Sequence, residues 1–190
     1  GAIVGARASS PAVLAQPAAT GDPFGQSGGA MNCAEAVGDI VWLCSGPRLL
    51  AVDVSDPARP RVLGRSAVLP GLLRALTLDE AGSRAWVLAG DQVLGLDLSD
   101  ATRPTELGRV YRGEYWARRQ PLVLAEQRLW MQGAVAGTVL GVDVADARQP
   151  KIVASLDVRS PTGGAVADLA AKDGLLYALA AYVLAFNRVL

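Results

Sequence analysis

Acidic residues recur at equivalent places along this chain, and carboxylates are groups that readily bind a cation or act as an acid–base pair. Asp53, Asp97 and Asp143 each end a short apolar segment, at spacings of 44 and 46 residues, and Asn187 follows 44 residues later. A ring of these side chains could form a cation site. Each aspartate, however, directly precedes a turn signal, where such a side chain typically bonds backbone N–H groups. The repetition therefore favours a structural role for all four residues.

The absence of histidine from the sequence excludes several kinds of catalytic and metal sites. A Ser-His-Asp or Cys-His nucleophile, a histidine-based metal site and an imidazole proton shuttle all require it. No glycine-rich phosphate-binding loop follows a strand and opens a helix. The sequence thus predicts no enzyme, no cofactor and no metal ion. An enzyme that uses paired carboxylates would need these side chains to converge on one opening of the fold. Aspartates that lie in separate turns do not favour such convergence.

The two cysteines flank a turn signal at Gly38 and Asp39. If these two residues form a two-residue hairpin turn, Cys33 and Cys44 face each other across the strands, near disulfide distance. A disulfide would imply an oxidising, extracytoplasmic location such as the periplasm or cell surface. The alternative is a pair of buried free thiols in a cytoplasmic protein.

One segment combines aromatic and basic residues in a way found nowhere else in the chain: "RVYRGEYWARR", residues 109–119. Aromatic residues and arginine are enriched at interface hot spots, and aromatic rings also stack on sugars and bases. The alternative is that the rings pack between structural units while the arginines are solvated. The candidate binding residues are Tyr111, Arg112, Glu114, Tyr115, Trp116, Arg118 and Arg119.

Charge and composition narrow the classes of partner. The 18 basic and 18 acidic residues balance, which argues against binding of nucleic acid. No apolar run approaches the roughly 18 residues of a membrane span. Hydrophobic residues make up 51% of the chain, and 21 glycines and 11 prolines punctuate short apolar runs. This pattern predicts a globular all-β fold with many turns.

The elements that carry these residues repeat with a period of about 44 residues. The segments "LLAVDVSDPARPRVLG", "VLGLDLSDATRPTELG" and "VLGVDVADARQPKIVA" align directly, and "YVLAFNRVL" begins a fourth copy. Each is preceded by a second strand with an aromatic residue, which is Trp42, Trp86, Trp130 or Tyr177. We expect these four rings in the core between units. The repeat pattern therefore predicts that each unit forms four short antiparallel strands, which is the arrangement of a β-propeller blade.

"AVDVSDPARPRVLG" resembles the LVIVD-repeat family of bacterial β-propellers, in which an aromatic strand is followed by a "vvDvsdP" strand and turn and a "P..vg" outer strand. The resemblance covers roughly residues 31–190. Ala101 and Ala147 depart from it, because they stand where the first proline of the turn would be. It implies the propeller fold and no particular activity.

We therefore expect one domain with four blades, at about 31–69, 70–113, 114–159 and 160–190. The fourth copy stops before its outer strand, and "GAIVGARASS", residues 1–10, has the pattern of the other outer strands. We expect residues 2–8 to close the ring as that missing strand; a frayed tail is the alternative. Residues 11–30 form an irregular insertion, either a connector or part of a binding face.

In a propeller, blade-to-blade connectors and the turns between the two middle strands lie on one face. That places the insertion, residues 109–119 and the "GAVAG" loop at 133–137 on the same side. The sequence thus predicts a non-catalytic, extracytoplasmic protein-binding or scaffold propeller, with an oligomer left open. The alternative is a carbohydrate-binding propeller that stacks sugars on Tyr111, Tyr115 and Trp116 beside Glu114.

Overall fold

The computed structural model describes residues 31–113, 120–158, 165–180 and 183–188, which form four antiparallel β-sheets, here called blades 1 to 4. Blade 1 consists of β1 (Met31–Val37), β2 (Ile40–Ser45), β3 (Arg48–Asp53) and β4 (Arg61–Arg65). Blade 2 consists of β5 (Leu73–Leu78), β6 (Arg84–Ala89), β7 (Gln92–Asp97) and β8 (Thr105–Tyr111). Blade 3 consists of β9 (Leu122–Ala125), β10 (Arg128–Gln132), β11 (Thr138–Asp143) and β12 (Lys151–Asp157). Blade 4 consists of β13 (Val166–Lys172), β14 (Leu175–Ala180) and β15 (Val183–Arg188).

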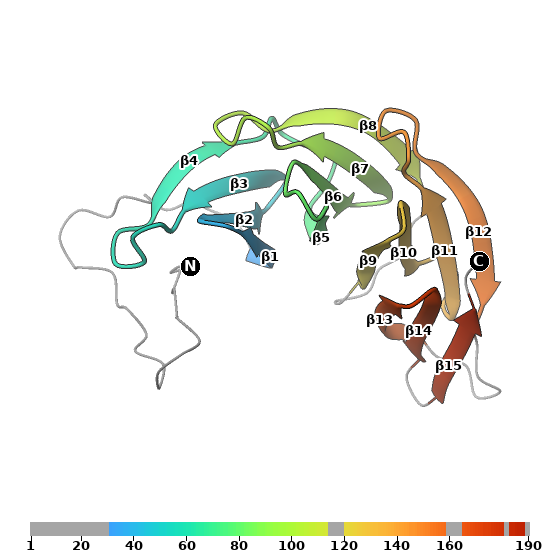
Figure 1. The fold of residues 1–190 in the computed structure, drawn as a ribbon. Helices are drawn as coiled ribbons and strands as arrows, with labels where there is room; N and C mark the ends of the chain where they lie inside the picture. Colours follow the sequence, from blue (N-terminus) through green and yellow to red (C-terminus); the bar gives the residue numbers. More distant parts are fainter. Residues whose placement is uncertain (1–30, 114–119, 159–164, 181–182, 189–190) are drawn as a thin grey trace.

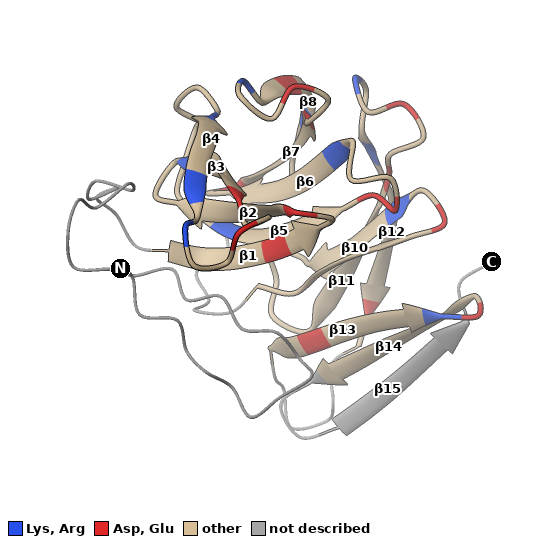
Figure 2. Cartoon of the chain, turned by 60° about the vertical axis from the view of Figure 1, so that its left-hand side comes forward, with Lys and Arg blue, Asp and Glu red and all other residues tan. Residues whose placement is uncertain are grey.

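The blades follow one another along an open arc (Figure 1). Within each sheet the strands pair in the order in which the chain forms them. The first strands of consecutive blades contact each other on the inside of the arc, β1 with β5, β5 with β9 and β9 with β13. The outer strands β4, β8 and β12 lie on its convex side (Figure 1). Many of the charged residues lie in turns and at strand ends (Figure 2).

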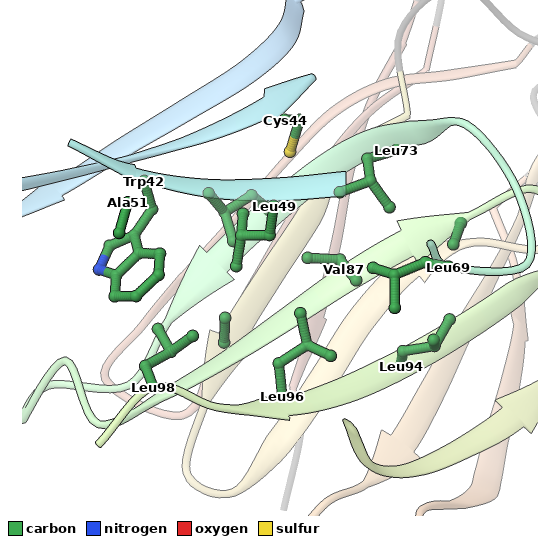
Figure 3. Packing of buried hydrophobic residues seen from close by; sticks show 13 residues of the cluster. Trp42, Cys44, Leu49, Ala51, Leu69, Leu73, Val87, Leu94, Leu96 and Leu98 are labelled. Atoms are coloured by element: carbon green, nitrogen blue, oxygen red, sulfur yellow. The ribbon is translucent and has the colours of Figure 1, made fainter. Parts of the chain in front are cut away.

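Each blade has a front face, toward the next blade in sequence, and a rear face, toward the preceding one. Apolar side chains from the front of one blade and the rear of the next form a shared core. Between blades 1 and 2, Trp42 and Leu49 meet Val87, Leu94 and other residues of blade 2 (Figure 3). Trp86 and Trp130 belong to the corresponding cores farther along the arc. The three tryptophans are at most 3% exposed, so their repetition reflects this packing between blades.

A close backbone approach ties the outer strands β4 and β8 to the turn of the next blade. An added Cβ at Gly64 on β4 would lie 2.0 Å from the carbonyl oxygen of Thr102, which belongs to the β7–β8 turn. At Gly108 on β8 it would lie 2.4 Å from the carbonyl oxygen of Arg148, in the β11–β12 turn. Glycine is required at these two places because any side chain would displace a backbone segment.

The strand register accounts for three of the aspartates and corrects the fourth position. The first residue of the second strand pairs with the last residue of the third, which is Asp53, Asp97 or Asp143 in blades 1 to 3. In blade 4 that place belongs to Arg188, paired with Leu175, and Asn187 lies one position away. Asn187 therefore does not share the register position of the three aspartates, contrary to the expectation from the repeat spacing. Tyr177 does share the register of the tryptophans, as the third residue of its strand.

A closed ring of four blades is not confirmed. Blade 4 has three described strands, and blades 1 and 4 lie at the two ends of the arc (Figure 1). The expected closing strand at residues 2–8 and the insertion at 11–30 lie outside the described residues. Within the described part of the chain, no helix has the length and apolar character needed to cross a membrane.

Candidate functional site

The repeated aspartates hold the turns that lead to the outer strands. Asp53 accepts a hydrogen bond of 2.8 Å from the backbone N–H of Ser55, and Asp97 accepts one of 2.8 Å from that of Ser99. For Asp53 the hydrogen bonds from the Ser55 hydroxyl and backbone hold the carboxyl pKa below its usual value. For Asp97 the backbone and hydroxyl of Ser99 have the same effect on the pKa. These carboxylates thus act as turn caps.

A second aspartate strengthens each of these turns, and sequence analysis did not single it out. It lies three residues after the first aspartate. Its carboxylate accepts a hydrogen bond of 2.9–3.0 Å from the backbone N–H of the residue two positions later. The three residues are Asp56, Asp100 and Asp146. Their regular spacing after the strand aspartates was the signal that could have identified them.

The two cysteines of blade 1 are joined. Cys33 on β1 and Cys44 on β2 form a disulfide with a Cα–Cα distance of 5.1 Å. The hairpin turn is the one that the sequence suggested, because Val37 pairs with Ile40 across Gly38 and Asp39. Cys44 is fully buried in the core shared with blade 2, so the disulfide anchors β1 at the inside of the arc.

Two sets of loops lie on one side of the arc, which we call the connector face. It comprises the described blade-to-blade connectors (66–72, 112–113, 120–121, 158 and 165) and the turns between second and third strands (46–47, 90–91 and 133–137). Backbone hydrogen bonds join the two sets: Leu69 donates to Pro47 at 2.8 Å, and Gly90 donates to Leu72 at 3.2 Å. Arg112 donates to Asp91 at 3.0 Å.

Arg112 lies under this face rather than on it. Its side chain is 4% exposed and donates to the side-chain oxygen of Gln120 at 2.6 Å and to the carbonyl of Gly90 at 3.1 Å. Burial lowers the pKa of the guanidinium, with Asp91 opposing and Arg74 adding to that effect. Arg112 is therefore engaged within the protein and is not open to a partner, whereas Tyr111 is 60% exposed.

The polar network of Arg112 continues toward blade 4. Gln132, 1% exposed, occupies the place that Cys44 and Leu88 hold in the first two blades, two residues after the tryptophan. Its side-chain oxygen accepts a hydrogen bond of 2.6 Å from the backbone N–H of Val166. Its backbone carbonyl oxygen accepts a hydrogen bond of 3.4 Å from the guanidinium of Arg112. A polar residue at an otherwise apolar repeat position was the sequence signal for this network.

The structure describes only part of the aromatic and basic segment. Arg109 forms a paired ion contact with Glu106 on the same strand, at 2.6 and 2.8 Å. Tyr111 ends β8 and is 60% exposed. The remaining candidates of this segment, Glu114, Tyr115, Trp116, Arg118 and Arg119, lie outside the described residues.

Exposed apolar side chains gather on the connector face. Among the described residues nine large hydrophobic side chains are exposed, and four of them belong to this face or its rim. They follow the arc from blade 1 to blade 3: Val68 (62% exposed), Leu72 (50%), Tyr111 (60%) and Val135 (57%). The connector and the "GAVAG" loop approach closely here, because a Cβ at Gly113 would lie 2.6 Å from the Ala134 methyl group. Exposed apolar surface can mark an interaction site, which makes this face the candidate binding surface.

Two polar side chains of β1 connect blade 1 to blade 2, and the sequence offered no signal for them. Asn32 donates to the carbonyl of Leu73 at 2.8 Å, and Glu35 accepts from the backbone N–H of Leu78 at 2.8 Å. Burial raises the pKa of Glu35, and the bond from Leu78 only partly opposes this rise. Both contacts satisfy backbone groups of β5, which forms no ladder with β1.

The side of the arc opposite the connector face carries two open grooves. One, of about 470 Å³, lies between blades 2 and 3 and is lined by Glu80, Arg84 and Glu126. The other, of about 270 Å³, lies between blades 3 and 4 and is lined by Glu126 and Lys172. In the described part of the chain, no three His, Cys, Asp or Glu side chains gather as a metal site would require.

Comparison with known proteins places the fold. No protein-family model matches the sequence, and no curated protein matches it significantly. The structure is similar to the β-propeller domain of Cps50 (Swd1) from Myceliophteria thermophila, at a TM-score of 0.64 and 13% identity over 84% of this chain and 54% of that one. It is similar to BamB from Moraxella catarrhalis, at a TM-score of 0.55 and 18% identity over 82% of this chain and 42% of that one.

A third similar structure is a putative 6-phosphogluconolactonase from Bacteroides fragilis, at a TM-score of 0.62 and 13% identity over 78% of this chain and 47% of that one. The chain thus spans about half the length of the solved structures that it matches. Likeness at this level of identity shows the fold alone. The repeat expected from the sequence is accordingly an all-β arrangement of β-propeller blades.

Proposed function

We propose that this chain is a non-catalytic protein-binding propeller that holds its partner on the connector face. The observation that carries the proposal is the set of four exposed apolar side chains there, Val68, Leu72, Tyr111 and Val135, each at least 50% exposed. Tyrosine is enriched among the residues that contribute most to binding at protein interfaces, and the fully buried core of an interface is more apolar than the rest of the surface. The aspartates that could have served catalysis are instead bonded within turns.

The connector face is also suited to present these side chains rigidly. The network around Arg112 and Gln132 joins blades 2, 3 and 4 directly beneath it. Connectors and turns are hydrogen-bonded to one another, as at Leu72 and Gly90. A surface fixed in this way loses little conformational entropy when a partner binds.

A matched pair of variants tests this proposal. Leu72→Ser with Tyr111→Ser removes two apolar groups from the connector face, while Ile152→Ser with Val153→Ser removes two similarly exposed groups from β12. We expect proteins cross-linked to the wild-type chain in its native host to remain with the β12 variant and to be lost from the connector-face variant. Equal retention by both variants would contradict the proposal.

A carbohydrate-binding propeller is the second candidate, and the exposed ring of Tyr111 favours it. A stacked sugar needs an accessible aromatic face such as this ring offers. A glycan array separates the two functions. Binding of a defined sugar that Tyr111→Ser abolishes would favour the carbohydrate function, whereas protein capture without sugar binding would favour the scaffold.

The remaining expectations complete the proposal. The Cys33–Cys44 disulfide supports an extracytoplasmic location, since such bonds persist in oxidising compartments. Thiol labelling of acid-quenched cells tests this, because labelling before reduction would contradict it.

The doubled aspartate turns support membership of the LVIVD-repeat propellers. Among the described strands, β15 pairs only with β14. This arrangement supports the expectation that residues 2–8 form the outer strand of a fourth blade.

A further inference from the structure

The groove between blades 2 and 3 has the dimensions of a ligand pocket. Its volume of about 470 Å³ falls within the range of about 300–1,000 Å³ that is typical of ligand sites. The β5–β6 turn of blade 2 lines one part of it, and the β9–β10 turn of blade 3 lines another. Leu78 and Leu124, both half-buried, add apolar surface to the lining. The groove can therefore accept an apolar stem between two blades.

Two carboxylates in this lining have no partner. Glu80 comes from the β5–β6 turn and Glu126 from the β9–β10 turn, and both side chains are exposed. Within the described part of the chain, neither takes part in a hydrogen bond or an ion pair. Asp79, the third acidic residue of the lining, differs because its carboxylate accepts hydrogen bonds within its own turn. Glu80 and Glu126 are thus available to a ligand.

One basic residue lies in the same lining, and it does not neutralise these carboxylates. Arg84 pairs with Asp97 across the β6–β7 ladder, and the two charges attract each other there. The acidic residues of the lining outnumber this single arginine. The groove therefore carries net negative charge and favours a positively charged occupant.

The other two interfaces between described blades lack this combination of space and charge. The groove between blades 3 and 4 is smaller, at about 270 Å³, and Arg128 and Lys172 balance its two acidic residues. Between blades 1 and 2 the hairpin turns pack directly, because a Cβ added at Gly82 would lie 2.5 Å from a methyl group of Val37. The acidic groove is therefore a property of one interface and not of the repeat.

We infer that the groove between blades 2 and 3 binds an arginine side chain from a basic segment of a partner protein. A guanidinium has five N–H donors in a planar fork, so it can donate to carboxylates from both blades at once. Such charge-assisted hydrogen bonds are stronger than those between neutral groups. The aliphatic stem of the arginine would lie on Leu78 and Leu124. This contact lies on the side opposite the connector face and does not depend on the function proposed for that face.

Fluorescence polarisation with a labelled Gly-Gly-Arg-Gly-Gly peptide tests the inference on the full chain. We expect saturable binding of this peptide, weaker binding of the same peptide with lysine, and none with glutamate. Replacing both Glu80 and Glu126 by glutamine should weaken binding of the arginine peptide at least tenfold. The connector-face variant Leu72→Ser with Tyr111→Ser should bind it as the wild type does, since those residues lie on the other side.

Asp39→Asn with Asp173→Asn is the matched control. It removes the same amount of charge from the first hairpin turns of blades 1 and 4, and neither residue lines this groove. This control should keep wild-type affinity. Equal weakening by both double variants would show a general charge effect and overturn the inference. So would a wild-type chain that binds no arginine peptide or that binds the lysine peptide equally well.

A calcium titration separates the arginine side chain from a metal ion as the occupant. Release of the peptide by calcium chloride, but not by sodium chloride at equal ionic strength, would assign the groove to a divalent cation and overturn the inference. Equal effects of the two salts at equal ionic strength are expected, because salt screens the charges of the peptide and the groove alike.

A last variant separates binding from folding. Glu126→Asn with Gln127→Gly places the residues that favour a turn with positive φ at both positions, so this variant should be more stable than the wild type. It also removes the Glu126 carboxylate, and we expect it to bind the arginine peptide at least threefold more weakly. A loss of affinity in a more stable protein cannot result from unfolding. Full affinity in this variant would overturn the inference.

Discussion

Replacing Gly64 by alanine tests how closely the outer strand β4 fits the β7–β8 turn of blade 2. The added Cβ would lie 2.0 Å from the Thr102 carbonyl oxygen and 2.3 Å from its carbonyl carbon, whereas ordinary contacts begin at 3.4 Å. The obstacle is backbone, which cannot rotate away as a flexible side chain can. Either the β7–β8 turn moves outward or blades 1 and 2 separate.

Two opposing effects decide the sign of the change. In a strand without unusual backbone angles, glycine-to-alanine substitution alone stabilises by about 0.4–1 kcal/mol, because it restricts the unfolded chain. Overpacking of a close contact costs about 1–3 kcal/mol. We therefore expect Gly64→Ala to lower the free energy of unfolding by about 0.5–2 kcal/mol and Tm by about 1–8 °C.

Thermal and urea unfolding, followed by circular dichroism and tryptophan fluorescence, measure the effect. Gly108→Ala should behave alike, because its Cβ would meet the Arg148 carbonyl oxygen at 2.4 Å. Arg65→Ala, an exposed change on the same strand as Gly64, is the control and should have little effect. An unchanged or raised Tm for both glycine variants would refute the close fit between strand and turn.

Three further changes should alter stability in defined directions. Replacing Cys33 and Cys44 by serine opens a bond between residues 11 apart and should cost about 3 kcal/mol in urea unfolding; an unchanged midpoint would contradict this. Glu126 and Gln127 form a two-residue turn with φ of 48° and 61°, so Asn-Gly at these positions should raise stability by about 1 kcal/mol, and a lower Tm would count against it. Burial raises the pKa of Glu35, so its contribution to stability is most favourable below pH 4.5 and falls as pH rises through the raised pKa. Glu35→Gln should therefore gain stability over wild type between pH 4 and pH 7, and parallel pH profiles for both proteins would show that Glu35 is not the cause.

The repeat made most of the fold predictable from sequence. The tryptophan spacing identified the core between blades, and prolines 60, 104 and 150 each stand directly before an outer strand. Asn187 was misplaced because counting residues from the preceding repeat ignores hairpin length, whereas strand pairing depends on it.

The candidate site was less predictable, because burial depends on contacts between distant segments. Arg112 looked like an exposed residue of a basic segment, yet it lies beneath the connector face with Gln120 and Gly90 as partners. The exposed leucine and valines of this face belong to a connector (Val68 and Leu72) and to a turn (Val135) outside the repeated strands, so no pattern distinguished them from core residues. Only their exposure in the structure does so.

The fit of the turns of blades 2 and 3 against the preceding outer strands also constrains how such a chain can be rearranged. Blades 1 and 2 both carry glycine at the position that receives a turn, whereas blade 3 carries Ala154 there. The first two units could be duplicated or exchanged and still accept the following turn. A copy of the third unit placed before either of the others would bring a methyl group against backbone. The order of the repeats is therefore not neutral, even though their sequences look interchangeable.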